Sequence, residues 1–470
     1  MHTRLTKIVC TIGPTSDTPK RIAALAKTGM SIARLNLSHG THQDHVRVLE
    51  ILRTINEKLP VPIGILLDTK GGEIRTGKRQ QPLEVHKGEE VVFYPPSMSS
   101  PPSERGNCIE VSYDNFYVDV KETDTILIDN GELAFDIVSV HDDGTVIARA
   151  RNDGSVGDCR HINLPGANID NPTITDNDWS DIDFAIEQDV DFLALSFIRT
   201  ARDIIGVREY IQTKGGTMEL IGKIETRQAI SHMQEIIQEA DGVMIARGDL
   251  GAEIPFEQLP AIQDDITARC NDAGKPVIIA THMLESMREY SIPTRAEMTD
   301  VAHAAVTYAD ATMLSGETAS GKHPDLSLQA MHRLLVTAEE YTHGRGIPPH
   351  LHIRGEYDIR AKAAVQLAHE TSSAVLIVFT RTGATAKQLS RYRPAVPIVA
   401  CTNSPVVQRK LSLLYGVSSL LIEFADAQTT IVRGIETAKK NGFIHEGEKL
   451  IVVSDVPKDV ADWSIQQRVL

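Results

Sequence analysis

The strongest constraint on the fold of this chain is a unit that recurs along it, a short apolar run followed by an amphipathic stretch of helical period. Near-continuous apolar runs between helices are typical of a parallel sheet covered on both faces. The runs are IVCTI from Ile8, SIARLNL from Ser31, IGILLD from Ile63, DFLALSF from Asp191, ELIGKIE from Glu219, GVMIAR from Gly242, PVIIAT from Pro276 and ATMLSG from Ala311. Eight such units predict an α/β fold with a closed (β/α)₈ TIM barrel.

Helix starts support this pattern. Ser16-Asp17, Thr200 and Thr294 each stand just before an amphipathic stretch, where Ser, Thr and Asp side chains cap the first backbone N–H groups. We expect the helices that follow them to comprise PKRIAALAKTG, ARDIIGVREYI and RAEMTDVAHAAV.

The spacing of the runs breaks once, between the third and the fourth. More than a hundred residues lie there, too many for a loop. The stretches EEVVFYPP, CIEVSY, TILIDNGELAFDIVSV and TVIARAR within this gap are typical of short strands separated by turns. We predict a small β-barrel domain inserted at residues 71–171, placed as a lid over the exit of the third strand.

A third segment follows the eighth unit. GRGIPPHLHIRG interrupts the pattern, and AVLIVFT, VPIVACT, VSSLLIEF and KLIVVSD then alternate with helical stretches. This alternation predicts a separate α/β domain at residues 341–470. The barrel domain would then comprise residues 1–70 and 172–340.

The charge balance limits the partners of the chain. Lys and Arg total 48 against 63 Asp and Glu, a net charge of −15 that argues against nucleic-acid binding. No apolar run is long enough to span a bilayer, and MHTRLTKIVC lacks the apolar core of a signal peptide. The five cysteines are scattered without a CxxC pair, so they suggest neither a disulfide framework nor a zinc cluster. We expect a cytoplasmic protein without a membrane partner.

Nearly every predicted barrel strand ends in polar residues, and barrel enzymes carry their chemistry at these carboxyl ends. The polar ends are Arg34, Asn36, Ser38 and His39 on the second strand, Asp68, Thr69 and Lys70 on the third, Ser196 on the fourth, Lys223 and Glu225 on the fifth, Arg247, Gly248 and Asp249 on the sixth, Thr281 on the seventh, and Ser315, Gly316 and Glu317 on the eighth. So many polar ends at one edge predict a site.

Lys223 and Glu225 alternate on one strand and could form a local salt bridge, just as Asp249 could cap a turn. Glu225 and Asp249 also end adjacent strands, however, and two such carboxylates suit Mg²⁺. We favour the metal site, with Lys223 as a cation beside it. Asn36, Ser38 and Asp68 offer a second oxygen cluster that suits a monovalent cation, although such residues often cap backbone groups.

A site this rich in cations suits a phosphorylated carboxylic acid together with a nucleotide. Phosphoryl transfer depends mainly on positioning and charge stabilisation. The sequence has no GxxxxGK[ST] loop and no Gly-rich loop before a lysine strand, so a phosphotransferase of this kind would belong to neither common class.

The chain resembles the pyruvate kinase family over essentially its whole length. The motifs that carry the resemblance are TKIVCTIGPTS, ARLNLSHG, LLDTKGGEIRTG, INLPG, SFIR, KIE, ARGDLGAEIP, KPVIIATHMLESM, PTRAE, MLSGETA and SRYRP. The resemblance implies the last step of glycolysis, in which phosphate passes from phosphoenolpyruvate to ADP to give pyruvate and ATP. It also implies Mg²⁺ as cofactor, for which Mn²⁺ can substitute, together with K⁺.

The resemblance assigns roles to single residues. Glu225 and Asp249 would bind Mg²⁺, and Lys223 would stabilise the phosphoryl group during transfer. Arg34, Gly248, Asp249 and Thr281 would hold phosphoenolpyruvate, with Gly248 and Asp249 giving N–H groups to its carboxylate, and Thr281 and Ser315 would help deliver the proton to the enolate. The remaining assignments are Asn36, Ser38, Asp68 and Thr69 for K⁺, and Asn36, Leu37, Ser38, His39 and Arg75 for the nucleotide.

The residue at position 73 and several departures from the family's usual residues affect what the resemblance implies. Members with Glu at the position of Glu73 generally need K⁺, which implies K⁺ dependence here. The family usually has Pro where this chain has Gly72, Gln at His282 and Asn at His303. It also usually has Asp-Gly at Tyr308-Ala309 and Lys-Gly at Arg160-His161, so substrate affinity, lid motion and pH optimum could differ.

The resemblance also implies an effector-binding site in the third domain. Thr380, Thr382, Gly383 and Thr385, in TRTGAT, match the phosphate-binding loop of the family's effector site, although Thr380 or Thr382 could simply cap a helix. The terminus VSDVPKDVADWSIQQRVL lacks the Gly-rich loop of members activated by fructose 1,6-bisphosphate. A sugar monophosphate or a nucleotide is the expected effector, if there is one, and a homotetramer is the usual assembly of the family.

Three interpretations of the whole chain follow. It is an active pyruvate kinase, another Mg²⁺-dependent barrel enzyme such as a lyase or aldolase acting on pyruvate or phosphoenolpyruvate, or a binding protein on a degenerate scaffold. The predicted lid, the oxygen cluster and the third domain favour the first over the second. Intact Lys223, Glu225, Asp249 and Thr281 argue against the third.

Overall fold

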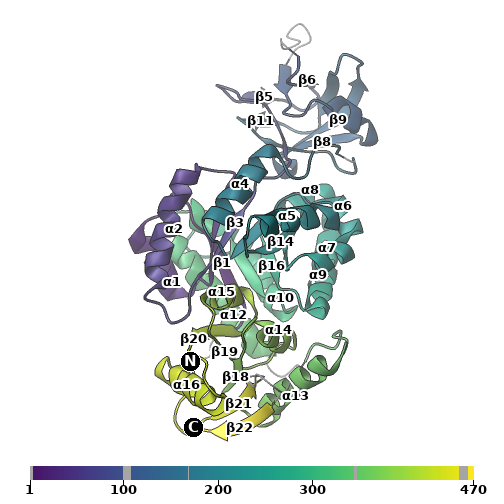
Figure 1. Ribbon diagram of the computed structural model, residues 1–470. Coiled ribbons are helices and arrows are strands. Elements are labelled where there is room, and N and C mark those ends of the chain that lie inside the picture. The colour runs from purple at the N-terminus through teal and green to yellow at the C-terminus, as the bar shows by residue number, and fades with distance from the viewer. Residues whose placement is uncertain (1–3, 99–106, 168, 343–346, 455–463) are drawn as a thin grey trace.

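The computed structural model describes residues 4–98, 107–167, 169–342, 347–454 and 464–470. The chain forms three parts arranged in a row, with a β-rich part at one end, a central barrel and an α/β part that holds the C-terminus at the other (Figure 1). Within the described residues, no helix is long and apolar enough to cross a membrane.

The central part is a closed barrel of parallel strands in the order β1-β17-β16-β15-β14-β13-β3-β2. The strands are β1 (Lys7–Thr11), β2 (Ile32–Asn36), β3 (Gly64–Asp68), β13 (Phe192–Leu195), β14 (Glu219–Ile224), β15 (Gly242–Ala246), β16 (Val277–Ala280) and β17 (Ala311–Leu314). They coincide with the eight apolar runs, so the predicted TIM barrel is confirmed.

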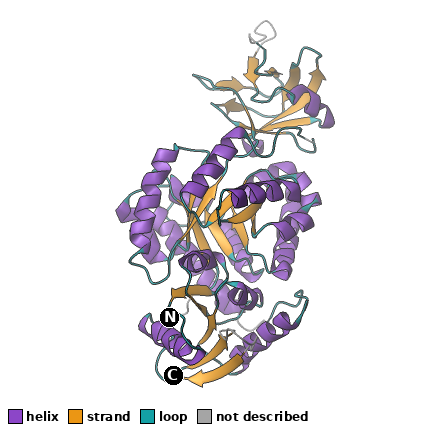
Figure 2. Cartoon of the chain, in the orientation of Figure 1, coloured by secondary structure: helices purple, strands orange, loops and turns teal. Residues whose placement is uncertain are grey.

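Alternation along each strand explains why these runs are apolar on both faces. In β1, Ile8 and Cys10 pack outward against the helices, whereas Val9 joins the core inside the barrel. In β3, Ile65 and Leu67 face outward and Leu66 faces inward. Both faces of each strand are therefore buried, as a barrel enclosed by helices requires (Figure 2).

The barrel helices lie outside the strands. They are α1 (Pro19–Thr28), α2 (His42–Asn56), α4 (Asp176–Glu187), α5 (Ala201–Thr213), α6 (Arg227–Ser231), α7 (Met233–Glu239), α8 (Arg247–Glu253), α9 (Leu259–Ala273), α10 (Arg295–Val306), α11 (Gly316–Ala319) and α12 (Pro324–Thr342). Thr200 and Thr294 cap α5 and α10 as predicted, each in a capping box. The first helix begins at Pro19, as predicted, but the capping hydrogen bond is accepted by Thr18 rather than by Ser16-Asp17.

Between β3 and α4 the chain forms the β-rich lid. Its elements are β4 (Ile74–Arg75), β5 (Leu83–Val85), β6 (Glu90–Tyr94), β7 (Asn107–Glu110), α3 (Phe116–Asp119), β8 (Thr125–Ile128), β9 (Leu133–Val140), β10 (Val146–Ala150), β11 (Gly154–Val156) and β12 (His161–Asn163). Seven strands form one sheet in the order β4-β12-β8-β9-β10-β6-β7, and β5 pairs with β11. An isolated bridge between Thr76 and Val111 brings the two sheet edges together, which nearly closes the sheet into a barrel.

The C-terminal part is a five-stranded sheet in the order β20-β19-β18-β21-β22. Its elements are α13 (Glu356–Glu370), β18 (Val375–Phe379), α14 (Ala384–Arg391), β19 (Ile398–Thr402), α15 (Pro405–Lys410), β20 (Val417–Leu421), α16 (Ala427–Lys440), β21 (Lys449–Ser454) and β22 (Ser464–Val469). The antiparallel edge strand β22 was not predicted, because SIQQRV carries too few apolar residues. Half of the terminal stretch compared with the Gly-rich loop, residues 455–463, lies outside the described residues.

The candidate active site at the barrel mouth

Lys223 is the centre of the polar cluster at the carboxyl ends of the strands. Its ammonium group lies 2.9 Å from Glu225 Oε1 and 3.0 Å from Asp68 Oδ1, and it donates to Ser196 Oγ at 2.6 Å. All four side chains are nearly excluded from solvent. Burial alone would lower the pKa of Lys223, but the two carboxylates raise it above its ordinary value. The predicted salt bridge to Glu225 therefore forms, and it is part of a larger network.

Asp68 is shared between two cations. One of its oxygens contacts Lys223, and the other accepts a hydrogen bond from Arg34 Nε at 2.7 Å. Arg34 also donates to Thr11 Oγ1 at 3.0 Å, which fixes the guanidinium group. Burial raises the pKa of Asp68, but Lys223 and Arg34 lower it more, so the net shift is downward. The carboxylate is ionised, and its charge is already balanced by these neighbours.

Ser196 connects this cluster to the predicted K⁺ site, although no role was predicted for it beyond its place at a strand end. Its hydroxyl donates to the backbone oxygen of Thr69 at 2.6 Å and lies 3.2 Å from Asp68 Oδ1. Its backbone N–H donates to Thr69 Oγ1 at 3.1 Å. Asn36 pairs with Asp68 in register, and its Oδ1 accepts the N–H of Ser38 at 3.2 Å. The four predicted K⁺ ligands thus lie on the neighbouring ends of β2 and β3.

Glu225 and Asp249 follow adjacent strands, β14 and β15. Glu225 is 1% exposed and accepts the Phe197 N–H at 2.7 Å. Burial raises the pKa of Glu225 to about 7, and Asp249 acts in the same direction while Lys223 opposes it. Glu225 shares the charge of Lys223 with Asp68, and a buried carboxylate whose charge is only partly balanced is suited to bind a further cation. Two carboxylates that follow adjacent strands suit Mg²⁺, which takes oxygen ligands and keeps water or substrate oxygens in its other positions. Among the described residues, no group of three or more His, Cys, Asp or Glu is arranged as a metal site, so Mg²⁺ would depend on substrate and water for its other ligands.

Thr281 lies in a strained turn beside Gly248. Thr281 and His282 have φ angles of 63° and 53°, in the left-handed region that β-branched residues such as Thr rarely adopt. Arg247 stabilises the turn by donating to Thr281 O at 2.7 Å and to Asp300 Oδ1 at 2.7 Å. The Gly248 N–H predicted to hold the substrate carboxylate donates instead to Thr281 Oγ1 at 2.8 Å. The substrate would have to replace this bond.

Ser315 ends the eighth strand and is positioned by Glu317. The Glu317 carboxylate accepts the N–H groups of Ser315 at 2.7 Å and of Leu284 at 3.0 Å. The Ser315 hydroxyl is buried and has no hydrogen-bond partner within the described part of the chain. An unsatisfied buried hydroxyl is uncommon, and it is available to a water molecule or a substrate.

A cavity of about 700 Å³ opens beside this cluster. Its wall includes Arg34, Asn36 and His39 from β2 and the turn after it, and Thr281 and Ser315, which follow β16 and β17. Its size falls within the range that holds a nucleotide-sized ligand. We call it the nucleotide cavity.

Three residues predicted for the nucleotide do not line this cavity. Leu37 and Ser38 are absent from its wall. Arg75 lies at the root of the lid, where it is paired with Glu73 and donates to Cys159 O at 2.8 Å. Arg75 is therefore held by contacts within the lid and is not part of the nucleotide cavity.

The departures from the family pattern lie in different surroundings. His282 is exposed, and His303 contacts Asp264 at 2.9 Å on the barrel surface. Tyr308 has a left-handed φ of 66°. Gly72 is buried, and a Cβ there would lie 2.4 Å from the Pro172 oxygen, so this backbone is packed for glycine.

His161, which stands where the family usually has Gly, lies close to the proposed metal ligands. Its Nδ1 is 3.5 Å from Asp249 Oδ1, and its ring stacks edge-on against Phe197 with centroids 5.6 Å apart. The lid therefore contacts the candidate site through His161, and this contact was not predicted from the sequence. Its neighbour Arg160 lies 3.5 Å from Asp129 within the lid.

The predicted effector loop lies in the C-terminal part, far along the chain from the barrel site. Gly383, with φ 88°, is the N-cap of α14, and its N–H donates to Thr380 Oγ1 at 3.0 Å. Thr382 Oγ1 accepts the Ala384 N–H at 3.4 Å, whereas Thr380 and Thr385 are buried. The threonines thus close the turn before the helix, without a side-chain cap on the helix itself.

The fold and the site together define a class of protein: a (β/α)₈-barrel enzyme with an inserted β-rich part, in which a buried lysine and buried carboxylates meet at the carboxyl ends of the strands. Comparison with known families agrees. The profile described as pyruvate kinase, barrel domain, matches residues 3–328, and that described as pyruvate kinase, alpha/beta domain, matches residues 359–463. The chain belongs to the pyruvate kinase family, which consists of phosphotransferases.

Individual relatives are similar over nearly the whole chain. Plastidial pyruvate kinase 2 of Arabidopsis thaliana is 39% identical over 458 residues, covering 96% of this chain and 78% of the relative. The pyruvate kinases of Sporosarcina psychrophila and Bacillus licheniformis are 38% and 36% identical, covering 97% and 96% of this chain and 78% of each relative. These matches support the first of the three interpretations of the sequence.

Proposed function

We propose that this chain transfers the phosphoryl group of phosphoenolpyruvate to ADP, giving pyruvate and ATP in the last step of glycolysis in the cytoplasm. The observation that carries the proposal is the position of Lys223. It is held between Glu225 and Asp68 at the barrel mouth, beside a cavity of nucleotide size. A fixed cation at that point stabilises the charge that develops on a phosphoryl group in transfer.

The neighbouring residues position the reactants. Glu225 and Asp249 would hold Mg²⁺, or Mn²⁺ in its place, and the bound ion would neutralise phosphoryl and carboxylate oxygens. Arg34, already oriented by Asp68 and Thr11, extends into the cavity wall where the transferred phosphate would lie. Asn36, Ser38, Asp68 and Thr69 would hold K⁺.

Proton delivery to the enolate would use Thr281 and Ser315, which also line the nucleotide cavity. The Thr281 hydroxyl bridges Ala280 O and the Gly248 N–H, and the Ser315 hydroxyl still has an unused hydrogen bond. We assign these two side chains to the proton path, with water carrying the proton between them and the enolate.

Glu225→Gln is expected to weaken Mn²⁺ binding at least about 100-fold, since changes merely next to a metal ligand already cost 10–100-fold. The amide oxygen can still accept the Phe197 N–H, so the fold should be unaffected. Titration calorimetry or Mn²⁺ EPR measures the affinity directly. Glu253→Gln, on a carboxylate outside the proposed set, is the matched control. Equal affinity of Glu225→Gln and wild type would remove Glu225 from the metal site.

Turnover is expected to require K⁺. Glu73 is paired with Arg75 at the lid root and brings no positive charge to the site. Pyruvate formation from phosphoenolpyruvate, ADP and Mg²⁺ should therefore be strong in K⁺ and weak in Tris alone. Full activity without K⁺ would contradict the Glu73 argument, and no activity in either salt would contradict the proposed reaction.

The remaining proposals concern the roles of the three domains, the effector site and the assembly of the protein. We assign residues 1–70 and 172–340 to catalysis, 71–171 to the lid and 341–470 to regulation, with a sugar phosphate or nucleotide bound at Thr380, Thr382, Gly383 and Thr385.

A homotetramer is supported by apolar side chains exposed around α13 and on the edge strand β22, namely Ile353, Tyr357, Ile359 and Val469. Sedimentation at the monomer mass of 51.6 kDa would contradict this assembly.

A further inference from the structure

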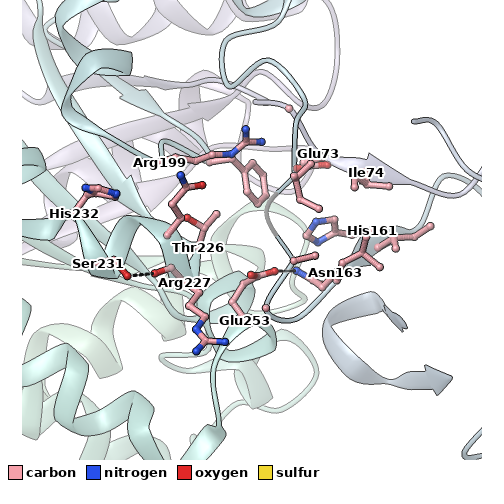
Figure 3. A pocket seen from close by; sticks show the side chains of 18 residues that line it. Glu73, Ile74, His161, Asn163, Arg199, Thr226, Arg227, Ser231, His232 and Glu253 are labelled. Carbon is pink, nitrogen blue, oxygen red and sulfur yellow. Dashed lines mark hydrogen bonds between the residues drawn. The ribbon is translucent and has the colours of Figure 1, made fainter. Parts of the chain in front are cut away.

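A second cavity, of about 460 Å³, lies at the hinge between the lid and the barrel (Figure 3). We call it the hinge cavity. It shares no wall residue with the nucleotide cavity, and Lys223, Glu225 and Asp249 do not line it. The side chains on which the argument rests are Glu73, His161 and Asn163 from the lid and Arg199, Arg227 and Glu253 from the barrel.

Asn163 lies on the lid strand β12 and is 4% exposed. Its amide nitrogen donates to Glu253 Oε1 at 3.1 Å, the contact drawn in Figure 3. Its amide oxygen has no hydrogen-bond donor among the described residues. Buried amide oxygens are nearly always hydrogen-bonded, so this one is suited to accept from a ligand that enters the cavity.

Arg199 lies on the barrel side, just after β13. One guanidinium nitrogen donates to Asn171 O at 2.8 Å, and no carboxylate of the described residues forms an ion pair with Arg199. Asp203, Asp170 and Asp119 act on its charge from longer range, but burial outweighs them and lowers the pKa of Arg199. A guanidinium group has five N–H donors, so most remain for an anion.

The two acidic residues of the cavity weaken this attraction little. Glu73 is paired with Arg75, which balances its charge. Burial raises the pKa of Glu253 to about 7, so at neutral pH it repels an anion less than an ordinary carboxylate would. Arg227 is exposed and adds a second cation at the opposite end of the opening from Arg199 (Figure 3).

We propose that the hinge cavity binds a small hydroxylated anion, whose carboxylate or phosphate contacts Arg199 and whose hydroxyl donates to Asn163 Oδ1. The volume suits a small organic ligand. Because Asn163 belongs to the lid and Arg199 to the barrel, the bound molecule connects the two and holds the lid at one angle. This site is separate from the substrate site of the proposed reaction.

Matched ligand pairs test the two contacts on the full chain by titration calorimetry. Glycerol 3-phosphate is compared with propyl phosphate, and glycerate with propionate, so that each pair differs in its hydroxyl groups. The hydroxylated member should bind about tenfold more tightly to the wild type, as one hydrogen bond to a buried acceptor provides. Asn163→Leu should abolish this difference, and Arg199→Gln should weaken both members of the pair. The tighter of the two pairs identifies phosphate or carboxylate as the head group.

Three results would overturn the proposal. These are equal binding of both members of each pair to the wild type, no binding of any probe at millimolar concentration, and strict competition of the hydroxylated probe with phosphoenolpyruvate. Arg227→Gln, on an exposed side chain, still tests the charge if a buried variant does not fold. Bound ligand should also slow hydrogen exchange at the hinge, residues 71–76, and unchanged exchange there would refute the connection between lid and barrel.

Discussion

Lys223→Met is expected to lower kcat for pyruvate formation by about 10³-fold or more while the chain remains folded. Removing a single preorganised hydrogen-bond donor from a developing anion typically costs 10²–10³-fold, and a full charge beside transferred phosphate should cost at least as much. The geometry supports a large effect, because the ammonium group is fixed by three oxygen contacts of 2.6 to 3.0 Å. Steady-state assays of phosphoenolpyruvate with ADP measure the change.

A second consequence of the same variant must be separated from the first. Without Lys223, Glu225 keeps only its bond to the Phe197 N–H and loses the cation that lowers its pKa. Mn²⁺ binding should therefore be measured beside turnover. Intact Mn²⁺ binding with lost turnover assigns Lys223 to phosphoryl transfer, whereas loss of both assigns it to assembly of the metal site.

Lys7→Met is the matched control. Lys7 is also a buried lysine on a barrel strand, but it lies at the opposite end of the barrel and donates to Val417 O at 2.5 Å. Its removal should leave kcat near the wild-type value. Similar turnover of Lys223→Met and wild type would refute the proposed role.

Asp310→Ala is expected to destabilise the chain by about 3–5 kcal/mol, the usual cost of breaking a buried ion pair from one side. Asp310 precedes β17 and accepts both terminal guanidinium nitrogens of Arg393 at 2.7 Å. It also accepts the N–H groups of Val277 and Tyr415, each at 3.1 Å. The variant would leave a buried guanidinium and two buried N–H groups without their acceptor. Urea unfolding followed by circular dichroism measures the loss.

A double replacement separates the charge from the packing. Because the pair is almost fully buried, Asp310→Leu combined with Arg393→Met should recover the part of the loss that comes from the unpaired guanidinium group, whereas the Val277 and Tyr415 N–H groups still lack their acceptor. Lys322→Met breaks an exposed ion pair with Glu289 and should cost less than about 1 kcal/mol. If Asp310→Ala lowers the free energy of unfolding no more than Lys322→Met does, the contact of Asp310 with Arg393 does not stabilise the packing of the C-terminal part against the barrel.

Local features of the sequence were enough to predict the barrel strands and the starts of α1, α5 and α10. A strand buried on both faces needs a continuous apolar run, and a helix start is favoured by a side-chain acceptor such as Thr294. Both features can therefore be recognised within a short stretch of the sequence. The capping residue of the first helix was not predicted, because Ser16, Asp17 and Thr18 are all good caps. Which one accepts the bond depends on where the preceding turn ends.

The sequence by itself determined which polar residues stand at the strand ends, because alternation and apolar length are properties of each strand alone. Only the tertiary structure decided which of them meet. Barrel closure places β3 beside β13 despite the inserted lid, and so brings Asp68 and Ser196 to Lys223. The left-handed turn at Thr281, the raised pKa of Glu225 and the contact of His161 with Asp249 also arise from this packing, since each depends on neighbours distant in sequence.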